Sequence, residues 1–204
     1  MSWRFGSAPR VDNVDLSTIR EVQAARFPAG QVDIEEFALS GAGKVTFHTS
    51  VSSIRVIPDN DNHPISWYFE NKCADGAVII QYESGLELHI VELKTKLTPD
   101  KWTLARRQLQ GMLANSLSIV GALSLESPAL VVCYVAFSVE TVGDFISTNT
   151  VVQKQLVGAE RASPDTKIAS YRDFKNAVLT LLDGQVVPVK LVYRDIHGNA
   201  SVTI

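Results

Sequence analysis

Apolar and polar positions in the middle of this chain form the pattern of a β-hairpin. Residues 77–82 and 86–94 are two mostly apolar runs, and the short polar segment Glu83-Ser84-Gly85 separates them. Short polar segments that contain glycine commonly connect paired strands. The pattern therefore predicts two antiparallel strands joined by a tight turn.

The position of the turn decides which side chains meet across this hairpin. A two-residue turn at Ser84-Gly85 predicts that Asp75 stands opposite Lys94 and diagonal to Glu92, with all three on one face. A three-residue turn shifts the register by one position and sends Asp75 to the other face, unless a bulge restores it.

A long helix and a buried strand are expected after the hairpin. Residues 99–123 place apolar side chains at helical spacing, with Thr98 as the N-cap and Pro99 at the first helical position. Residues 129–137 form a continuous apolar run, which is typical of a strand buried on both faces. Strand, helix and buried strand together predict a crossover to a parallel strand.

The remaining patterns predict flanking elements. The expected elements are a short helix from Ser17 to Arg26, strands at 31–39, 44–48, 51–57 and 65–69, a loop at 58–64, a short helix near 142–146, a loop around 163–165, a helix over 170–183 that stops at Gly184, and a hairpin of 187–193 with 200–204. The first 15 residues carry no strong pattern and are interpreted as an arm.

Length and composition fit one folded domain, residues 1–204. The chain has 204 residues, 46% of them hydrophobic and 20% charged, which is enough for a substantial core. No apolar run approaches the roughly 18 residues of a membrane helix, and the start lacks the apolar core of a signal peptide. We therefore expect a cytoplasmic protein with no membrane partner. A homodimer stays open.

Cysteine and histidine usage gives no sign of a metal site. Cys73 and Cys133 lie in or beside apolar stretches, which favours buried thiols over a disulfide. The histidines show no ligand spacing, and His89 faces away from Glu92 in the hairpin. We interpret His89 as a packed or hydrogen-bonded strand residue.

Glu92-Leu93-Lys94 is the strongest candidate for chemistry. Glu92 and Lys94 project from the same face of the strand, roughly 7 Å apart along it. Charged side chains in a mostly buried strand need a partner or a metal ion. The alternatives are a cross-strand salt bridge for Glu92 and Lys94, and a turn-forming Asp-Gly pair for Asp75.

A basic stretch begins at the same place. It holds one acidic residue, Asp100, among Lys94, Lys96, Lys101, Arg106 and Arg107. The net charge of −3 argues against a protein that coats nucleic acid non-specifically, but it allows a local patch. The stretch is either a solvated helix face or a set of phosphate contacts.

Asp75, Glu92-Leu93-Lys94, the following helix and the buried strand together resemble the restriction-endonuclease-like, or PD-(D/E)XK, nuclease superfamily. The resemblance covers roughly residues 65–137. It implies an α/β fold, a restriction-endonuclease-like mixed β-sheet flanked by helices, here with an added N-terminal strand region and a C-terminal helix plus hairpin. Ala74 departs from the family pattern, which often has proline there.

The resemblance implies a site and an activity. Asp75 and Glu92 would hold Mg²⁺ or Mn²⁺, and Lys94 and Gln108 would complete the catalytic set, although Gln108 also fits an ordinary polar position on the helix flank. The family's acid on the first helix has no sure counterpart among Glu21, Glu35, Glu36 and Glu70. The implied activity is metal-dependent hydrolysis of nucleic acid, more readily DNA, with Lys96, Lys101, Arg106 and Arg107 on the phosphates. The alternative is an inactive relative that binds protein or nucleic acid.

Overall fold

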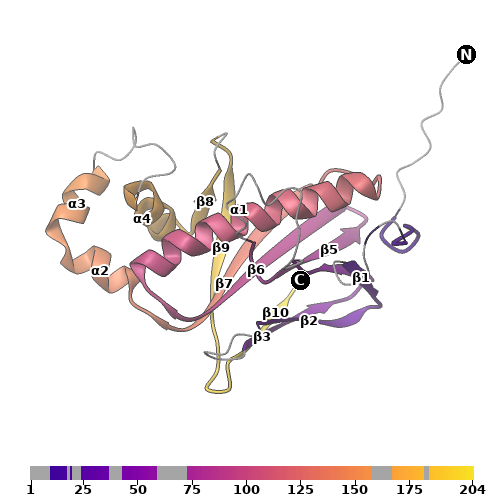
Figure 1. Cartoon of the computed structure of the whole chain (residues 1–204), viewed down its shortest axis with the longest axis horizontal. Coiled ribbons are helices and arrows are strands. Elements are labelled where there is room, and N and C mark those ends of the chain that lie inside the picture. The colour runs from indigo at the N-terminus through magenta and orange to yellow at the C-terminus, as the bar shows by residue number, and fades with distance from the viewer. Residues whose placement is uncertain are drawn as a thin grey trace, which may run out of the picture.

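The described strands form two sheets that lie against each other (Figure 1). The structure is a computed structural model that describes residues 10–17, 19, 24–36, 43–58, 73–157, 167–181 and 184–204. The larger sheet has seven strands, in the spatial order β1 (Ala24–Phe27), β4 (Ser53–Val56), β5 (Gly76–Tyr82), β6 (Gly85–Leu97), β7 (Leu130–Glu140), β9 (Val186–Tyr193) and β8 (Val178–Thr180). The smaller sheet has the order β10 (Asn199–Thr203), β3 (Gly43–Thr49) and β2 (Gly30–Glu36).

The helices of the described residues lie on one side of the larger sheet. They are α1 (Pro99–Ala122), α2 (Val142–Thr148), α3 (Thr150–Val157) and α4 (Lys167–Asn176). In Figure 1, α1 runs across the sheet above β6 and β7, while β2, β3 and β10 lie below it. The predicted α/β class with a mixed sheet flanked by helices is confirmed.

The predicted crossover through α1 is confirmed. Thr98 caps the helix, because its hydroxyl accepts a hydrogen bond from the Lys101 backbone N–H at 3.3 Å. The buried face of α1 includes the predicted Trp102, Leu109 and Met112. The chain then enters β7, which pairs in parallel with β6.

Two apolar cores hold the layers together. The core under α1 contains Ile90 and Leu109, and the core between the two sheets contains Phe47 and Leu93. The alternation of β6 explains the division, because even-numbered residues up to Lys94 face α1 and odd-numbered residues face the smaller sheet.

His89 lies on the side of β6 that faces the smaller sheet. Its contacts there confirm the interpretation of a packed or hydrogen-bonded strand residue. Its Nδ1 atom is 3.0 Å from the Tyr134 hydroxyl, and its Nε2 atom is 3.1 Å from Glu87 Oε2. Cys133 is buried, Cys73 is partly buried, and both thiols are free, so the prediction of no disulfide also holds.

The turn of the β5–β6 hairpin lies one residue earlier than predicted. Tyr82 pairs with Gly85, so the connecting residues are Glu83 and Ser84. Gly85 adopts a φ of 132°, a conformation that glycine tolerates, and starts β6 instead of forming the turn. The register is displaced by two residues, which keeps every side chain on its predicted face.

The N-terminal region differs from the sequence expectation. Ala24–Phe27 is strand β1, not the end of a helix, because it pairs antiparallel with β4 at the sheet edge. Residues 20–23 lie outside the described part of the chain. Val11 and Val14 are buried, so residues 10–15 pack on the domain and do not form an arm.

Strands β2, β3 and β4 confirm the three strands predicted before residue 58. The predicted strand at 65–69 and most of the loop before it lie outside the described residues, as does the loop around 163–165. The predicted short helix near 142–146 is α2. Helix α3 follows it and had no counterpart in the expectations.

The C-terminal expectations were wrong in two places. Helix α4 ends at Asn176, and Val178–Thr180 is strand β8, although the sequence predicts a helix to residue 183. Ala177 has a φ of 52°, which stops the helix, and Asp173 accepts bonds from the backbone and hydroxyl of Thr180. The apolar spacing over this segment fits both a helix and a strand.

Strands β9 and β10 exist, but they do not form a hairpin. β9 pairs in parallel with β7, and β10 pairs in parallel with β3 of the other sheet. The turn around Asp195, whose carboxylate accepts bonds from the backbone of His197 and Asn199, carries the chain between the layers. No helix of the described residues is long and apolar enough to span a membrane.

Candidate functional site

Asp75 lies where β5 begins, next to Glu92 on the neighbouring strand. The β5–β6 register ends with the pair of Gly76 and Val91, so Asp75 stands beside Glu92. The sequence-based prediction that Asp75 stands opposite Lys94 is therefore wrong. The Leu93 backbone N–H donates a hydrogen bond of 2.6 Å to Asp75 Oδ2. The Asp75 carboxylate is therefore held at the peptide bond that follows Glu92.

Glu92 is a buried charged residue on the face that α1 covers. Its exposed fraction is 0%, and the Lys94 ammonium donates a hydrogen bond to its Oε1 atom. Its other oxygen, Oε2, is buried and makes no hydrogen bond within the described residues. Lys94 is 14% exposed at the side chain, so it connects Glu92 with the protein surface.

Burial and neighbouring charges shift the titration of this group. Burial raises the pKa of Asp75 above its ordinary value, while the Leu93 hydrogen bond and the Lys94 charge partly oppose that rise. Burial lowers the pKa of Lys94, and the charges of Asp75 and Glu36 oppose that change. The environment thus disfavours charge on each residue alone and favours it when the opposite charge is near.

Gln108 supports the segment that leads to Asp75. Its side-chain Nε2 donates to the Cys73 carbonyl at 3.3 Å, and its backbone carbonyl accepts from the Ala74 N–H at 2.9 Å. Its Oε1 atom is buried without a hydrogen-bond partner in the described structure. The structure thus gives Gln108 contacts that position the start of β5.

A third acid, Glu36, reaches the same region from the end of β2. Burial raises its pKa, and the charge of Asp75 raises it further, while Lys94 lowers it. These interactions place its carboxylate within electrostatic reach of the pair formed by Asp75 and Lys94. Of the other candidate acids, Glu35 is exposed on β2, and Glu21 and Glu70 lie outside the described residues.

Arg194 approaches Glu36 from the end of β9. Its side chain is 2% exposed, and its Nη1 atom is 3.9 Å from Glu36 Oε2, too long for a hydrogen bond. Gly43 leaves room for the guanidinium, because a Cβ atom there would lie 2.1 Å from Arg194 Nη1. Arg194 therefore adds a buried positive charge that lowers the pKa values of both Glu36 and Asp75.

The basic residues divide into surface and interior positions. Lys96 and Lys101 are exposed, and Arg107 is partly buried. Arg106 is buried and pairs with Asp173, with 2.7 Å between Nη2 and Oδ2. The prediction that Arg106 contacts phosphate is therefore wrong, because its guanidinium ties α1 to α4.

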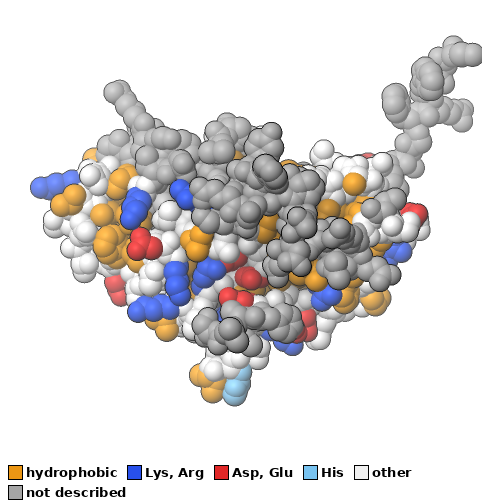
Figure 2. Space-filling view, viewed as in Figure 1, with side chains coloured by type: hydrophobic (Ala, Val, Ile, Leu, Met, Phe, Trp, Pro, Cys, Tyr) orange, Lys and Arg blue, Asp and Glu red, His pale blue; other side chains and the backbone are white. Residues whose placement is uncertain are grey.

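Acidic and basic side chains gather on the face shown in Figure 2. Asp and Glu side chains lie at its centre, and Lys and Arg side chains flank them. This arrangement places carboxylates that could bind a cation beside charges that could bind phosphate.

The residues present fit a hydrated divalent ion better than a fully protein-ligated one. The described residues contain no group of three histidine, cysteine or acidic side chains arranged to hold a metal. Mg²⁺ commonly binds through one or two carboxylates and keeps several waters. Asp75 and Glu92 supply two carboxylates on neighbouring strands, and Oε2 of Glu92 makes no hydrogen bond in the described structure.

Sequence reasoning missed Arg194, and it named Glu36 only as one of several acids. The available signal was that Arg194 follows an apolar strand that could be parallel to residues 86–94. The carboxyl ends of parallel strands meet at one edge of a sheet. Pairing that strand with residues 200–204 removed Arg194 from this edge in the prediction.

Comparison with known proteins adds no assignment. No protein-family model matches the chain, and neither a curated protein nor a solved structure matches it.

Proposed function

We propose that this chain is a metal-dependent nuclease with the restriction-endonuclease-like, PD-(D/E)XK, arrangement. The observation that carries the proposal is the position of Asp75, whose carboxylate sits on the peptide next to buried Glu92. Two neighbouring carboxylates and one ammonium on a shared sheet face are suited to phosphodiester hydrolysis. The antiparallel hairpin, the α1 crossover and the parallel strand β7 support the same assignment.

Asp75 and Glu92 are the residues that would hold Mg²⁺ or Mn²⁺. When bound, such an ion polarises the scissile phosphate and lowers the pKa of a coordinated water. Glu36 lies close enough to add negative potential to the same place. Gln108 keeps the segment before Asp75 in position through its contacts with Cys73 and Ala74.

Lys94 acts on the substrate side of this arrangement. Its ammonium lies between the carboxylate of Glu92 and solvent, so it can neutralise charge that develops on the phosphate. Lys96 and Lys101 lie farther out and supply sequence-independent attraction for the flanking phosphates. DNA is the preferred substrate in this proposal.

One observation favours a second function. The contact between Lys94 and Glu92 neutralises the buried carboxylate without any ion. A protein that kept this ion pair only for structure would be a catalytically inactive binding module for nucleic acid or protein.

A cleavage assay separates the two functions. Plasmid and single-stranded DNA are incubated with the wild-type chain in Mg²⁺, in Mn²⁺ and in EDTA. We expect cleavage only with metal, and loss of nearly all cleavage in the variants Asp75→Asn, Glu92→Gln and Lys94→Ala. Glu83→Gln is the matched control, because Glu83 is an exposed acid in the turn of the same hairpin.

The variants also differ in how they should fail. Lys94→Ala should still be stabilised by the metal ion but should lose cleavage activity, since the Lys94 charge acts on the phosphate. Glu92→Gln should lose both the stabilisation by metal and the cleavage activity. Wild-type protein that cleaves neither substrate with either ion supports the binding module and contradicts the nuclease.

A further inference from the structure

Tyr193 is an exposed aromatic residue on the sheet face that carries Glu92 and Lys94. Strand register joins Lys94 to Phe137 and Phe137 to Tyr193, so the three residues form one row across β6, β7 and β9. Directly paired residues share a face. Adjacent strands lie about 4.8 Å apart, which puts Tyr193 roughly 10 Å from Lys94 at the backbone.

The ring of Tyr193 is supported on one side and open to solvent. Phe137 is fully buried and meets it edge to face, with 4.7 Å between ring centroids and 71° between the planes. Tyr193 itself is 69% exposed. An aromatic ring held in one orientation by a buried neighbour provides a flat surface for another ring.

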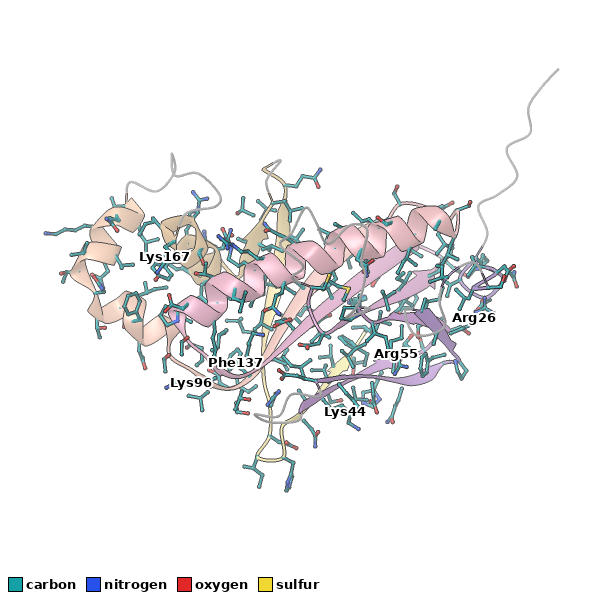
Figure 3. The ribbon with its side chains drawn as sticks, in the orientation of Figure 1. Arg26, Lys44, Arg55, Lys96, Phe137 and Lys167 are labelled. Atoms are coloured by element: carbon teal, nitrogen blue, oxygen red, sulfur yellow. The ribbon has the colours of Figure 1, made fainter. Side chains whose placement is uncertain are left out.

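Lys94 and Lys96 on β6 bring positive charge to this end of the sheet, where the acids Glu92 and Asp195 also lie. Lys96 is exposed, two residues after Lys94 on β6. It pairs in register with Val139 of β7, which is 49% exposed. Figure 3 labels Lys96 and Phe137, which lie at the same end of the sheet. The nearest acid at the end of β7, Glu140, is occupied by a hydrogen bond from the Gly143 backbone at 2.7 Å.

We infer that Tyr193 stacks on an unpaired base of the substrate while the adjacent phosphate lies at Lys94. This inference rests on the proposed function and specifies its substrate class as single-stranded or locally unpaired nucleic acid. Within a duplex each base is covered by its neighbours, so only an unpaired base can present its face to the ring. The lysines favour this polyanionic occupant over an apolar protein surface or a second copy of the chain.

The test measures binding in the absence of cleavage. A labelled single-stranded oligonucleotide and the duplex of the same sequence are titrated in EDTA with wild-type protein and with Tyr193→Ala, Tyr193→Phe and Val186→Ala. Val186 is the matched control, because it is an exposed apolar residue at the opposite end of β9. The ring is mostly exposed, so Tyr193→Ala should fold, and circular dichroism verifies this.

We expect Tyr193→Ala to weaken single-strand binding by at least about fivefold, the lower end of what one stacked base contributes. Duplex binding should change by less than about twofold, because a paired base does not reach the ring. Tyr193→Phe keeps the aromatic face and should bind like the wild type, as should Val186→Ala.

Other results overturn the inference. Unchanged single-strand binding in Tyr193→Ala, an equal loss on single strand and duplex, or no single-strand binding by the wild type each contradict stacking. A shift in oligomeric state with Tyr193→Ala and no change in oligonucleotide affinity would assign the ring to a contact between copies. Selective single-strand binding through Tyr193 without metal-dependent cleavage would support the stacking surface and contradict the nuclease.

Discussion

Asp75 and Leu93 are joined by a hydrogen bond of 2.6 Å from the Leu93 backbone N–H to the Asp75 carboxylate. This bond fixes the carboxylate at the point where β5 begins and β6 continues past it. Because the donor is a backbone group, the Asp75 carboxylate is held at a fixed point on β6, directly after Glu92. The candidate site is therefore organised by the sheet itself.

The pKa of Asp75 predicts how stability depends on pH without metal. Burial raises this pKa above 3.8 in the folded state, so ionising Asp75 costs stability as pH rises from 3.8 through the folded pKa. Asp75→Asn keeps the acceptor for Leu93 and removes that cost. We expect the variant to be more stable than wild type near neutral pH in EDTA, and this advantage to disappear as pH falls below 3.8.

Urea unfolding of both proteins across this pH range measures the difference directly. An advantage of Asp75→Asn that grows on acidification would have the opposite sign and would refute the assignment of a buried, charge-penalised carboxyl group.

The buried pair of Arg106 and Asp173 should be a major contributor to stability. Their side chains are 6% and 1% exposed, so replacing Arg106 leaves the Asp173 carboxylate buried without this cation. Arg106→Ala should lower the free energy of unfolding by about 3–5 kcal/mol. Lys96→Ala, a change at an exposed lysine, should stay within about 0.5 kcal/mol of wild type.

Chemical denaturation is the appropriate measurement for this pair. If Arg106→Ala has the same free energy of unfolding as Lys96→Ala, the guanidinium is not tied to α4. That result would support the phosphate-binding role predicted from the sequence.

Gly43 should be required for the position of Arg194. A methyl group at residue 43 would overlap the guanidinium, which must then shift from its position beside Glu36. Since Arg194 lowers the pKa of Glu36, Gly43→Ala should raise it and weaken the metal-dependent activity. Gly121→Ala is the matched control, because nothing lies within 4 Å of a Cβ at that helical position.

The readout is the rate of metal-dependent cleavage alongside the free energy of unfolding. Gly121→Ala should keep the wild-type rate and gain up to about 1 kcal/mol, the helix propensity of alanine over glycine. A Gly43→Ala protein with wild-type rate would show that Arg194 does not influence the site.

The central part of the fold could be read from the sequence because its signals are local and agree with each other. The apolar spacing of residues 99–123, the cap at Thr98 and the run at 129–137 specify helix, start and strand independently. The hairpin register was wrong by two positions, yet its faces were right, since side-chain direction repeats every two residues.

The peripheral parts could not be read in this way because their partners are distant in sequence. Nothing local to residues 199–203 indicates pairing with β3, about 150 residues earlier in the numbering. The same error removed Arg194 from the site. Glu36 shows a related limit, because the role of a polar residue at the end of a strand can be judged only when the position of that strand relative to the other strands is known.

Stability also separates a metal site from a structural ion pair at Lys94. Lys94→Ala leaves the Glu92 carboxylate buried and unpaired, so in EDTA it should lower the free energy of unfolding by about 3–5 kcal/mol. Mg²⁺ should recover part of that loss, because an ion can replace the missing charge. A loss that no divalent ion alters would indicate an ion pair kept for structure alone.

The most direct test of the account is the unfolding free energy of wild type and Glu92→Gln, measured in EDTA and at saturating Mg²⁺ and Mn²⁺. An ion held by Asp75 and Glu92 should stabilise wild type by about 2.7 kcal/mol at a hundredfold excess over the dissociation constant. Glu92→Gln should show little of this gain. Wild-type stability that is the same with and without either ion, or an equal gain in both proteins, would contradict a metal site formed by Asp75 and Glu92.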